Sequence, residues 1–355
     1  MSNYETQEEA MNKRRSIKLL GAAGALVAVL CMTGAPLWAQ TKVADSAQWN
    51  EVVKAAEKEG SVALYVTVAP GQVDAVIAAF AKAYPKIRLE AFRNSDSVVN
   101  QKIRQEISVG ADGADVIFAT KNNFFDELLS KNALVKPSVP ALGSIKDAKY
   151  YEGVVPIASR LPILLAYNTN LVKGNPHNYT DFLKPEYDGM LGIPVVDGSP
   201  VTTGWWDFLR TTDPGYWEKL AKLKPKVYAS SVPLGQAVAS GEVAVAVLAT
   251  PGSVGSLINN GAPIKMVAPD KVYGMELLLG TFKNSKRPNA ALVLTNFLLS
   301  DEGQAAINGG GLGISIRPNV PGAMPEMTMI TSDPKTETPD KLKKVVADWK
   351  TIFTN

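Results

Sequence analysis

From residue 46 onward, the sequence alternates between short apolar runs and longer stretches whose apolar residues have helical spacing. The run 62–66 is apolar throughout, as expected for a strand that is covered on both faces. It is followed by a helical pattern at 73–84, and then by a second strand at 87–92 and a second helix at 97–109. This order predicts parallel strands joined by crossover helices, the doubly wound α/β class.

A second set of elements follows an irregular, proline-bearing stretch at 137–156. Its expected strands lie at 162–167, 192–196, 243–248 and 264–267, with a short helix at 203–209. Two later segments, 274–282 and 289–299, are expected to return to the first set, and an amphipathic helix at 341–353 closes the chain.

Chain crossings near Val155 and Lys271 would divide this pattern into two discontinuous lobes, with a hinge and a ligand cleft between them. The lobe boundaries that we predict are 40–155 with 272–325 for the first lobe, and 156–271 with 326–355 for the second.

The first 39 residues are typical of a cleaved signal peptide. A basic cluster precedes an apolar core at 19–29, and small residues lead to Ala39, after which we expect cleavage. The core is shorter than the roughly 20 residues of a spanning helix, which disfavours a retained membrane anchor. The pair Arg14 and Arg15 also resembles a twin-arginine signal, so the export route stays open, as does a start at Met11. We expect a periplasmic protein.

The composition excludes several classes of function. The predicted mature chain has 316 residues with 33 basic and 31 acidic side chains, so no strong positive charge supports nucleic-acid binding. The only cysteine, Cys31, lies in the signal segment, which removes thiol chemistry and thiolate metal sites from the mature chain. We expect no metal and no cofactor.

Hydroxyl-bearing and small residues stand where the predicted strands end and the next helices begin. In open α/β sheets, ligands bind beyond these carboxyl ends, where helix N-termini favour oxygen-bearing and anionic groups. Serine and threonine are also ordinary helix caps, so each could serve only its own helix. The candidate ligand-binding residues of this kind are Thr67, Ser95, Ser97, Thr120, Thr202, Thr203, Thr250 and Gly252.

A few charged residues could complete the pocket. Arg160, near the first crossing, is the candidate for binding a carboxylate or phosphonate, although a hinge ion pair would explain it equally well. Arg93 could play the same part, and Glu276 would suit an ammonium group, which makes a zwitterion a lesser alternative to a simple acid. Trp205 and Trp206 could wall the pocket, but core packing is the simpler interpretation.

Several segments, in their order and spacing, resemble bacterial extracellular solute-binding proteins, in the branch with the periplasmic binders of ferric ion, polyamines, thiamine and phosphonates. The resemblance covers nearly all of 46–320 and implies the two-lobed type II periplasmic-binding fold. The segments that carry it are 57–65, 114–118, 167–172, 239–243 and 296–304.

The sequence departs from this group where ferric ion would be bound. The resemblance implies a tyrosine pair where Pro251 and Gly252 stand, and often a histidine where 67–69 stands. The only histidine, His177, lies in another loop. Bare iron(III) prefers hard anionic oxygen or imidazole ligands, so it is disfavoured here.

Enzyme motifs fail in their context. Ser253 lacks the glycine that a nucleophile elbow needs two places before it, and the glycines at 309–313 follow a helix rather than a strand. We therefore expect no enzyme but a monomeric protein that captures a small, anionic organic solute for an inner-membrane ABC permease. Two alternatives remain: binding of ferric iron or an iron chelate, and a periplasmic sensor for a receptor kinase.

Overall fold

The computed structural model describes residues 46–146, 148–196, 200–333 and 335–354, and residues 40–355 form one compact unit. The expected signal peptide and its cleavage after Ala39 lie outside the described residues. Among the residues described, no helix is both long and apolar enough to cross a bilayer.

The strands follow one hydrogen-bonded path, β2-β1-β3-β11-β6-β9-β7-β8, and the remaining strands pair at its sides. Their bounds are β1 Ser61–Val66, β2 Arg88–Arg93, β3 Val116–Thr120, β4 Leu134–Val135, β5 Tyr150–Tyr151, β6 Val155–Asn168, β7 Leu191–Pro194, β8 Lys226–Tyr228, β9 Val245–Ala249, β10 Ile264–Val267, β11 Val272–Phe282, β12 Ile314–Ser315 and β13 Met329–Thr331.

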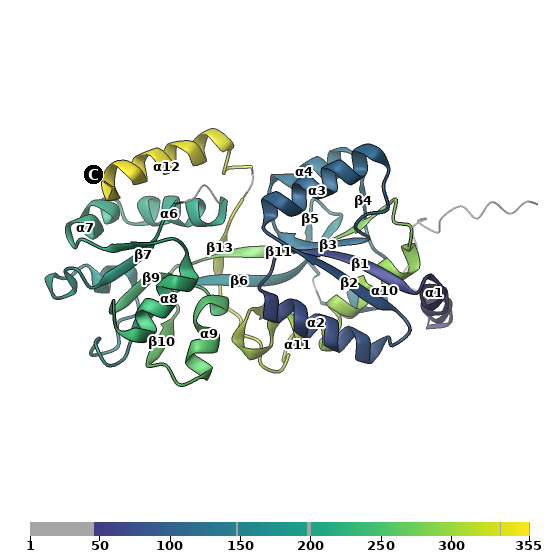
Figure 1. The fold of residues 1–355 in the computed structure, drawn as a ribbon, viewed down its shortest axis with the longest axis horizontal. Helices are drawn as coiled ribbons and strands as arrows, with labels where there is room; N and C mark the ends of the chain where they lie inside the picture. Colours follow the sequence, from purple (N-terminus) through teal and green to yellow (C-terminus); the bar gives the residue numbers. More distant parts are fainter. Residues whose placement is uncertain (1–45, 147, 197–199, 334, 355) are drawn as a thin grey trace, which may run out of the picture. The chain divides into compact units, whose positions relative to one another are not determined.

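The first half of this path consists of β2, β1, β3 and β11. Strands β1, β2 and β3 are parallel, as the alternating pattern predicts, and β11 is antiparallel to both β3 and β6. The second half consists of β9, β7, β8 and β10, in which β7 is parallel to β8 and β9. Strand β6 belongs to both halves, because it pairs with β11 near its start and with β9 and β10 near its end (Figure 1).

Helices connect the strands and cover both faces of each half (Figure 1). Their bounds are α1 Ser46–Glu59, α2 Pro70–Ala83, α3 Asp96–Val109, α4 Asn123–Ser130, α5 Pro140–Gly143, α6 Pro200–Thr212, α7 Tyr216–Lys222, α8 Ser231–Ser240, α9 Pro251–Asn259, α10 Pro288–Leu299, α11 Asp301–Asn308 and α12 Pro339–Phe353, with short 3-10 turns at Tyr179–Phe182, Pro185–Tyr187 and Gly309–Gly311.

Alternate side chains of β1 enter different cores, because successive residues of a strand point to opposite faces. Leu64 and Val66 pack with α2 and α10, whereas Tyr65 packs with Val99 of α3 and Phe125 of α4. The second half repeats this arrangement, with α6, α7 and α12 on one face and α8 and α9 on the other. Each half is therefore a layer of strands between two layers of helices.

Two local expectations need correction. The stretch 203–209 is predicted to be a short helix, but α6 begins three residues earlier, at Pro200, and ends at Thr212. The stretch 137–156 was expected to be irregular, yet it contains α5 and β5, and β6 begins at Val155 rather than at 162. Local patterns miss these bounds because pairing with β5 and β11 keeps the proline-bearing backbone extended.

Candidate functional site

The carboxyl ends of the parallel strands and the N-termini of the next helices supply the framework of the site. In the first half, β1, β2 and β3 end at Val66, Arg93 and Thr120, and α2, α3 and α4 begin within a few residues. In the second half, β7 and β9 lead into α6 and α9. Ligands of open α/β sheets bind at such ends, because free N–H groups and the helix dipoles face outward there.

The two halves meet at one pair of these helix starts. A Cβ built on Gly252, in the first turn of α9, would lie 3.9 Å from Cβ of Ala69, the residue just before α2. Helix α9 also contacts the glycine turn Gly309–Gly311 that follows α11. Gly252 therefore stands at a close approach between elements of the two halves.

The structure places the candidates of the first half at strand ends and helix starts. Thr67 follows β1, and its N–H donates to the Phe118 carbonyl. Ser95 is the residue before α3, and its exposed hydroxyl lies 3.1 Å from that of Ser97. Thr120 ends β3 and is buried. All four residues therefore remain candidates, and Ser95 and Ser97 are the exposed ones.

The candidates of the second half differ in their surroundings. Thr203 is fully buried inside α6, and its hydroxyl has no hydrogen-bond partner, so it lines the core side of the helix. Thr202 is half-buried one residue earlier. Thr250 precedes α9, and its N–H donates a hydrogen bond to the Ser253 hydroxyl oxygen at 3.0 Å. Thr250 and Gly252 thus share one helix start, whereas Thr203 points away from solvent.

Trp205 and Trp206 are fully buried and contribute to the core rather than to a pocket wall. Their rings pack edge to face against each other, and the Trp205 indole N–H donates to the Tyr179 hydroxyl at 3.2 Å. Trp206 also packs against Trp349 of α12, which attaches the C-terminal helix to α6. The simpler interpretation of these two residues, core packing, is confirmed.

Arg160 lies where β6 passes from the first half to the second. It stands opposite Glu276 of β11 in the antiparallel register, so the two side chains share a face of the sheet. Its guanidinium forms an ion pair with Glu326, whose side chain is 68% exposed. Ion pairs with such exposed partners contribute about 0–1 kcal/mol, so Glu326 is a weak competitor for Arg160.

Lys121 is a basic residue of this region that the sequence reasoning missed. It directly follows Thr120, its N–H donates to the Glu276 carbonyl, and its ammonium group forms an ion pair with the Glu276 carboxylate. The two side chains are only 10% and 14% exposed. Glu276 therefore already has a cationic partner within the chain. A lysine just after a buried strand was the available sequence signal.

A second missed feature is the start of α3. Asp96 and Asn100 are one helical turn apart, and one side-chain oxygen of each is buried without a hydrogen-bond partner, as is the Thr67 hydroxyl oxygen. Burial raises the pKa of Asp96, and the nearby Thr67 hydroxyl opposes this shift without reversing it. Arg93, which ends β2, donates from Nε to the Val68 carbonyl. The start of α3 thus holds acceptor oxygens that have no hydrogen-bond partner among the described residues.

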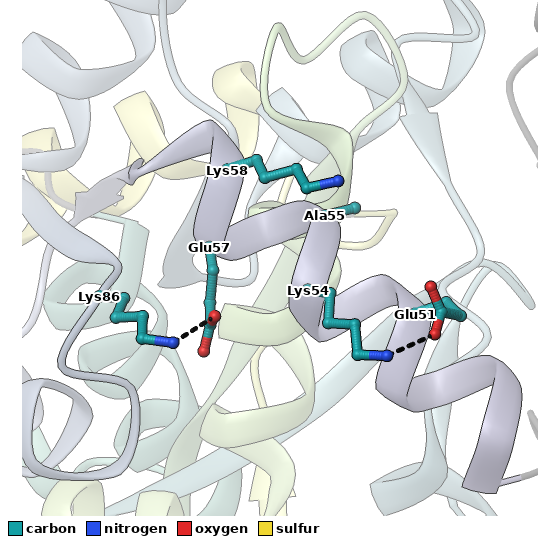
Figure 2. A pocket seen from close by; sticks show the side chains of 6 residues that line it. All are labelled: Glu51, Lys54, Ala55, Glu57, Lys58 and Lys86. Carbon is teal, nitrogen blue, oxygen red and sulfur yellow. Dashed lines mark hydrogen bonds and ion pairs between the residues drawn. The ribbon is translucent and has the colours of Figure 1, made fainter.

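Two cavities among the described residues lie elsewhere, and none of the candidate residues lines either of them. One is a shallow hollow of about 380 Å³ beside α1, where Lys54 pairs with Glu51 and Lys86 pairs with Glu57 (Figure 2). The other, of about 430 Å³, lies at the C-terminal end of α3 beside residues 284–286. The charged side chains of the first cavity are exposed and paired with one another, and the cavity lies away from the carboxyl ends of the strands. We therefore assign it no part in the candidate site.

Metal binding and serine hydrolysis are two further kinds of chemistry that the described residues can be tested for. No group of three or more histidine, cysteine, aspartate or glutamate side chains gathers there as metal ligands would. The Ser253 hydroxyl donates to the Thr250 carbonyl, and His177, the only histidine of the chain, lies in a loop beside Asp181 and Asp270. A serine without a base beside it does not form a hydrolase triad.

Several solved structures resemble this chain in fold. Iron-bound HitA from Pseudomonas aeruginosa is 19% identical, with a TM-score of 0.63 over 82% of this chain and 99% of HitA. The periplasmic binding protein AfuA from Actinobacillus pleuropneumoniae, bound to fructose-6-phosphate, is 17% identical, with a TM-score of 0.62 over 83% and 99%. The substrate-binding protein of an ABC transporter from Agrobacterium tumefaciens is 14% identical, with a TM-score of 0.68 over 82% and 94%.

These likenesses show the two-lobed type II periplasmic-binding fold that the resemblance in the sequence implies. No curated protein matches the chain significantly by sequence. The model of one family, described as bacterial extracellular solute-binding protein, matches residues 75–338, which is most of the chain. By this match, the chain belongs to the family of bacterial extracellular solute-binding proteins.

Proposed function

We propose that this protein is the periplasmic solute-binding component of an ABC uptake system, and that it clamps a small anionic organic solute between its lobes. The observation that carries the proposal is the approach of Gly252, at the start of α9, to Ala69, at the start of α2. Two helix N-termini on opposite lobes favour an anion held between them. The partner that receives the solute would be an inner-membrane permease, and the protein itself would act as a monomer without catalysis.

The lobe boundaries in this proposal are 40–155 with 272–325, and 156–271 with 326–355. Three features support two discontinuous lobes and a crossing of the chain within β6. Strand β6 starts in the first half of the sheet and ends in the second. Strand β11 pairs with β3 and β4 of the first half. Helix α12 packs on α6 and α7 of the second half.

Arg160 is the cation that we assign to the anionic group of the solute. Its side chain is 21% exposed, deeper than its partner Glu326, and an arginine can bind a carboxylate or phosphonate through two parallel hydrogen bonds. Lys121 adds positive charge at the end of β3, which is separated from β6 by β11, although Glu276 already pairs with Lys121. A solute anion would therefore replace the exposed Glu326 rather than the buried Glu276.

A thermal-shift screen of the chain without its first 39 residues tests the proposal. The panel holds aliphatic and aromatic carboxylates, phosphonates, phosphate esters, amino acids, polyamines, thiamine, and ferric iron with and without citrate. A ligand at 100 times its Kd adds about 2.7 kcal/mol, enough for a rise of a few degrees in Tm. We expect a shift with an organic anion that is lost in Arg160→Met and kept in the matched control Arg88→Met, an exposed arginine on β2. Equal shifts in both variants would remove Arg160 from the site.

Iron remains the second candidate because HitA, one of the similar structures, is iron-bound. Ferric citrate is an anion, so it could use the same helix starts and Arg160 without side chains that ligate bare iron. The screen separates the cases. A shift with ferric citrate and none with citrate would favour a chelate, and a shift with bare ferric iron would favour direct ligation.

A sensor that presents the solute to a receptor kinase would use the same clamp and differ only in its partner.

A further inference from the structure

The start of α3 gathers acceptor atoms that the fold of the described residues leaves without partners. Buried polar atoms in native proteins are nearly always hydrogen-bonded, so each exception calls for an explanation. Three of these exceptions lie together, namely Thr67 Oγ1, Asp96 Oδ1 and Asn100 Oδ1. All three residues are partly exposed although these oxygens are buried, which places the atoms just below the surface.

The strand and helix geometry explains why the three side chains converge. Tyr65 of β1 packs against Val99 and Ile103 of α3, so the alternation of the strand turns Thr67 toward the same helix. Asp96 and Asn100 are four residues apart in α3 and so share one face of it. The Thr67 hydroxyl lies close enough to the Asp96 carboxyl to influence its pKa.

The cations near this point are used in other ways. Arg93 donates from Nε to the Val68 carbonyl and forms no ion pair within the described residues. Lys102 pairs with Glu106, further along α3, and Lys121 pairs with Glu276. Within the part of the chain that the structure describes, the Asp96 carboxyl thus forms no ion pair, and a buried carboxylate oxygen without a partner is costly.

The location is that of the proposed cleft. Thr67 is two residues before Ala69, which lies against Gly252 of α9. A solute held between the starts of α2 and α9 would therefore have the start of α3 within reach. Separation of the lobes would move α9 away and open this point to solvent.

We propose that Thr67, Asp96 and Asn100 form an acceptor subsite that binds a protonated amine of the solute. A primary ammonium group has three N–H donors, which matches three acceptor oxygens, and its positive charge compensates Asp96. The inference rests on the proposed function and narrows it, because the solute then carries an anionic group near Arg160 and an amine near Asp96.

The experiment uses pairs of probes that differ only in an amine or a hydroxyl group. The pairs are L-alanine with L-lactate, L-glutamate with 2-hydroxyglutarate, and 2-aminoethylphosphonate with 2-hydroxyethylphosphonate, each titrated calorimetrically into the parent and into Asp96→Asn. Asp74→Asn, an exposed carboxylate on α2, is the matched control. We expect one amine probe to bind more tightly than its hydroxyl analogue, and Asp96→Asn to weaken that probe roughly ten- to hundredfold, as for a hydrogen bond to a charged group.

Each other outcome contradicts the subsite. Equal binding of the two members of every pair, binding of hydroxyl members alone, or no binding by any amine would overturn it. A loss in Asp74→Asn as large as that in Asp96→Asn would also overturn it. The two proposals fail separately. Acids that bind without an amine and depend on Arg160 would sink the subsite and keep the anion clamp. An amine that depends on Asp96 but not on Arg160 would keep the subsite and sink the anion clamp.

Discussion

Asp115 is the residue whose loss should most sharply test how this fold is held together. It directly precedes β3, and its side chain is 1% exposed. Its carboxylate accepts hydrogen bonds from the Ala63 N–H at 2.7 Å, from the Ser285 hydroxyl at 2.6 Å and from Arg287 Nε at 2.7 Å. These bonds join β1 to the segment between β11 and α10.

The magnitude follows from what Asp115→Ala would leave behind. Arg287 would lose its buried partner, and the Ala63 N–H and the Ser285 hydroxyl would lose theirs. Removal of one partner from a buried ion pair costs about 3–5 kcal/mol. At about 2.1 cal/mol/K per residue over about 300 residues, this corresponds to a fall of about 5–8 °C in Tm.

Asp112→Ala is the matched control, because Asp112 binds the same arginine through two hydrogen bonds of 2.9 Å but is 53% exposed. Exposed pairs contribute about 0–1 kcal/mol, so Tm should fall by less than about 2 °C. Differential scanning calorimetry of the two variants provides the comparison. Equal falls in Tm would refute the reasoning that burial, rather than the number of hydrogen bonds, sets the cost.

Three other predictions concern the cleft. Arg160→Met should lower the affinity for an organic anion by tenfold or more, as measured by calorimetry, because the exposed Glu326 is a weak competitor for the Arg160 guanidinium. An unchanged affinity would count against the anion clamp. Gly252→Ala should bind the organic anion like the parent, since the added Cβ would make an ordinary contact of 3.9 Å with Ala69. Gly252→Leu should weaken this binding roughly five- to 150-fold, because the larger side chain overpacks the contact between α9 and α2. Equal binding by both variants would place Gly252 outside the contact that forms when the lobes close. Because burial raises the pKa of Asp96 above its ordinary 3.8, the folded state binds a proton there more tightly than the unfolded state does. The free energy of unfolding should therefore fall as the pH rises from the unfolded-state pKa to the folded-state pKa. Asp96→Asn should abolish this fall, and a pH profile of Tm that is the same in the variant and the parent would contradict the burial of the carboxyl.

Much of the framework could be predicted from local sequence patterns. Strand β10 lies at the predicted 264–267, and β1 and β2 differ from prediction by a residue or so at their ends. Burial on both faces produces continuous apolar runs, and helices on a sheet need an apolar stripe, so both patterns are visible without knowledge of the neighbours. The starts of α3 and α9, with Ser95 and Thr250 before them, follow from the same patterns.

The candidate site could be predicted only in part. The sequence pattern predicts Thr203 at the start of a short helix, but α6 starts three residues earlier, and Thr203 is buried inside it. It treated Glu276 as a partner for a solute, but Lys121, 155 residues away in the chain, already pairs with it. It passed over Asp96, whose surroundings depend on Thr67 at the end of another strand. None of these facts has a local signature, because each arises from a contact between distant segments.

The sequence by itself determined the alternation of strands and helices, the parallel order of the first strands and the likeness to solute-binding proteins, since all three depend on residue spacing along the chain. Only the tertiary structure decided which charges are already paired, which oxygens are buried without partners, and that the start of α9 approaches the start of α2. The physical reason is that burial and pairing are set by neighbours brought together across the sheet, and a side chain's chemistry depends on those neighbours more than on its own type.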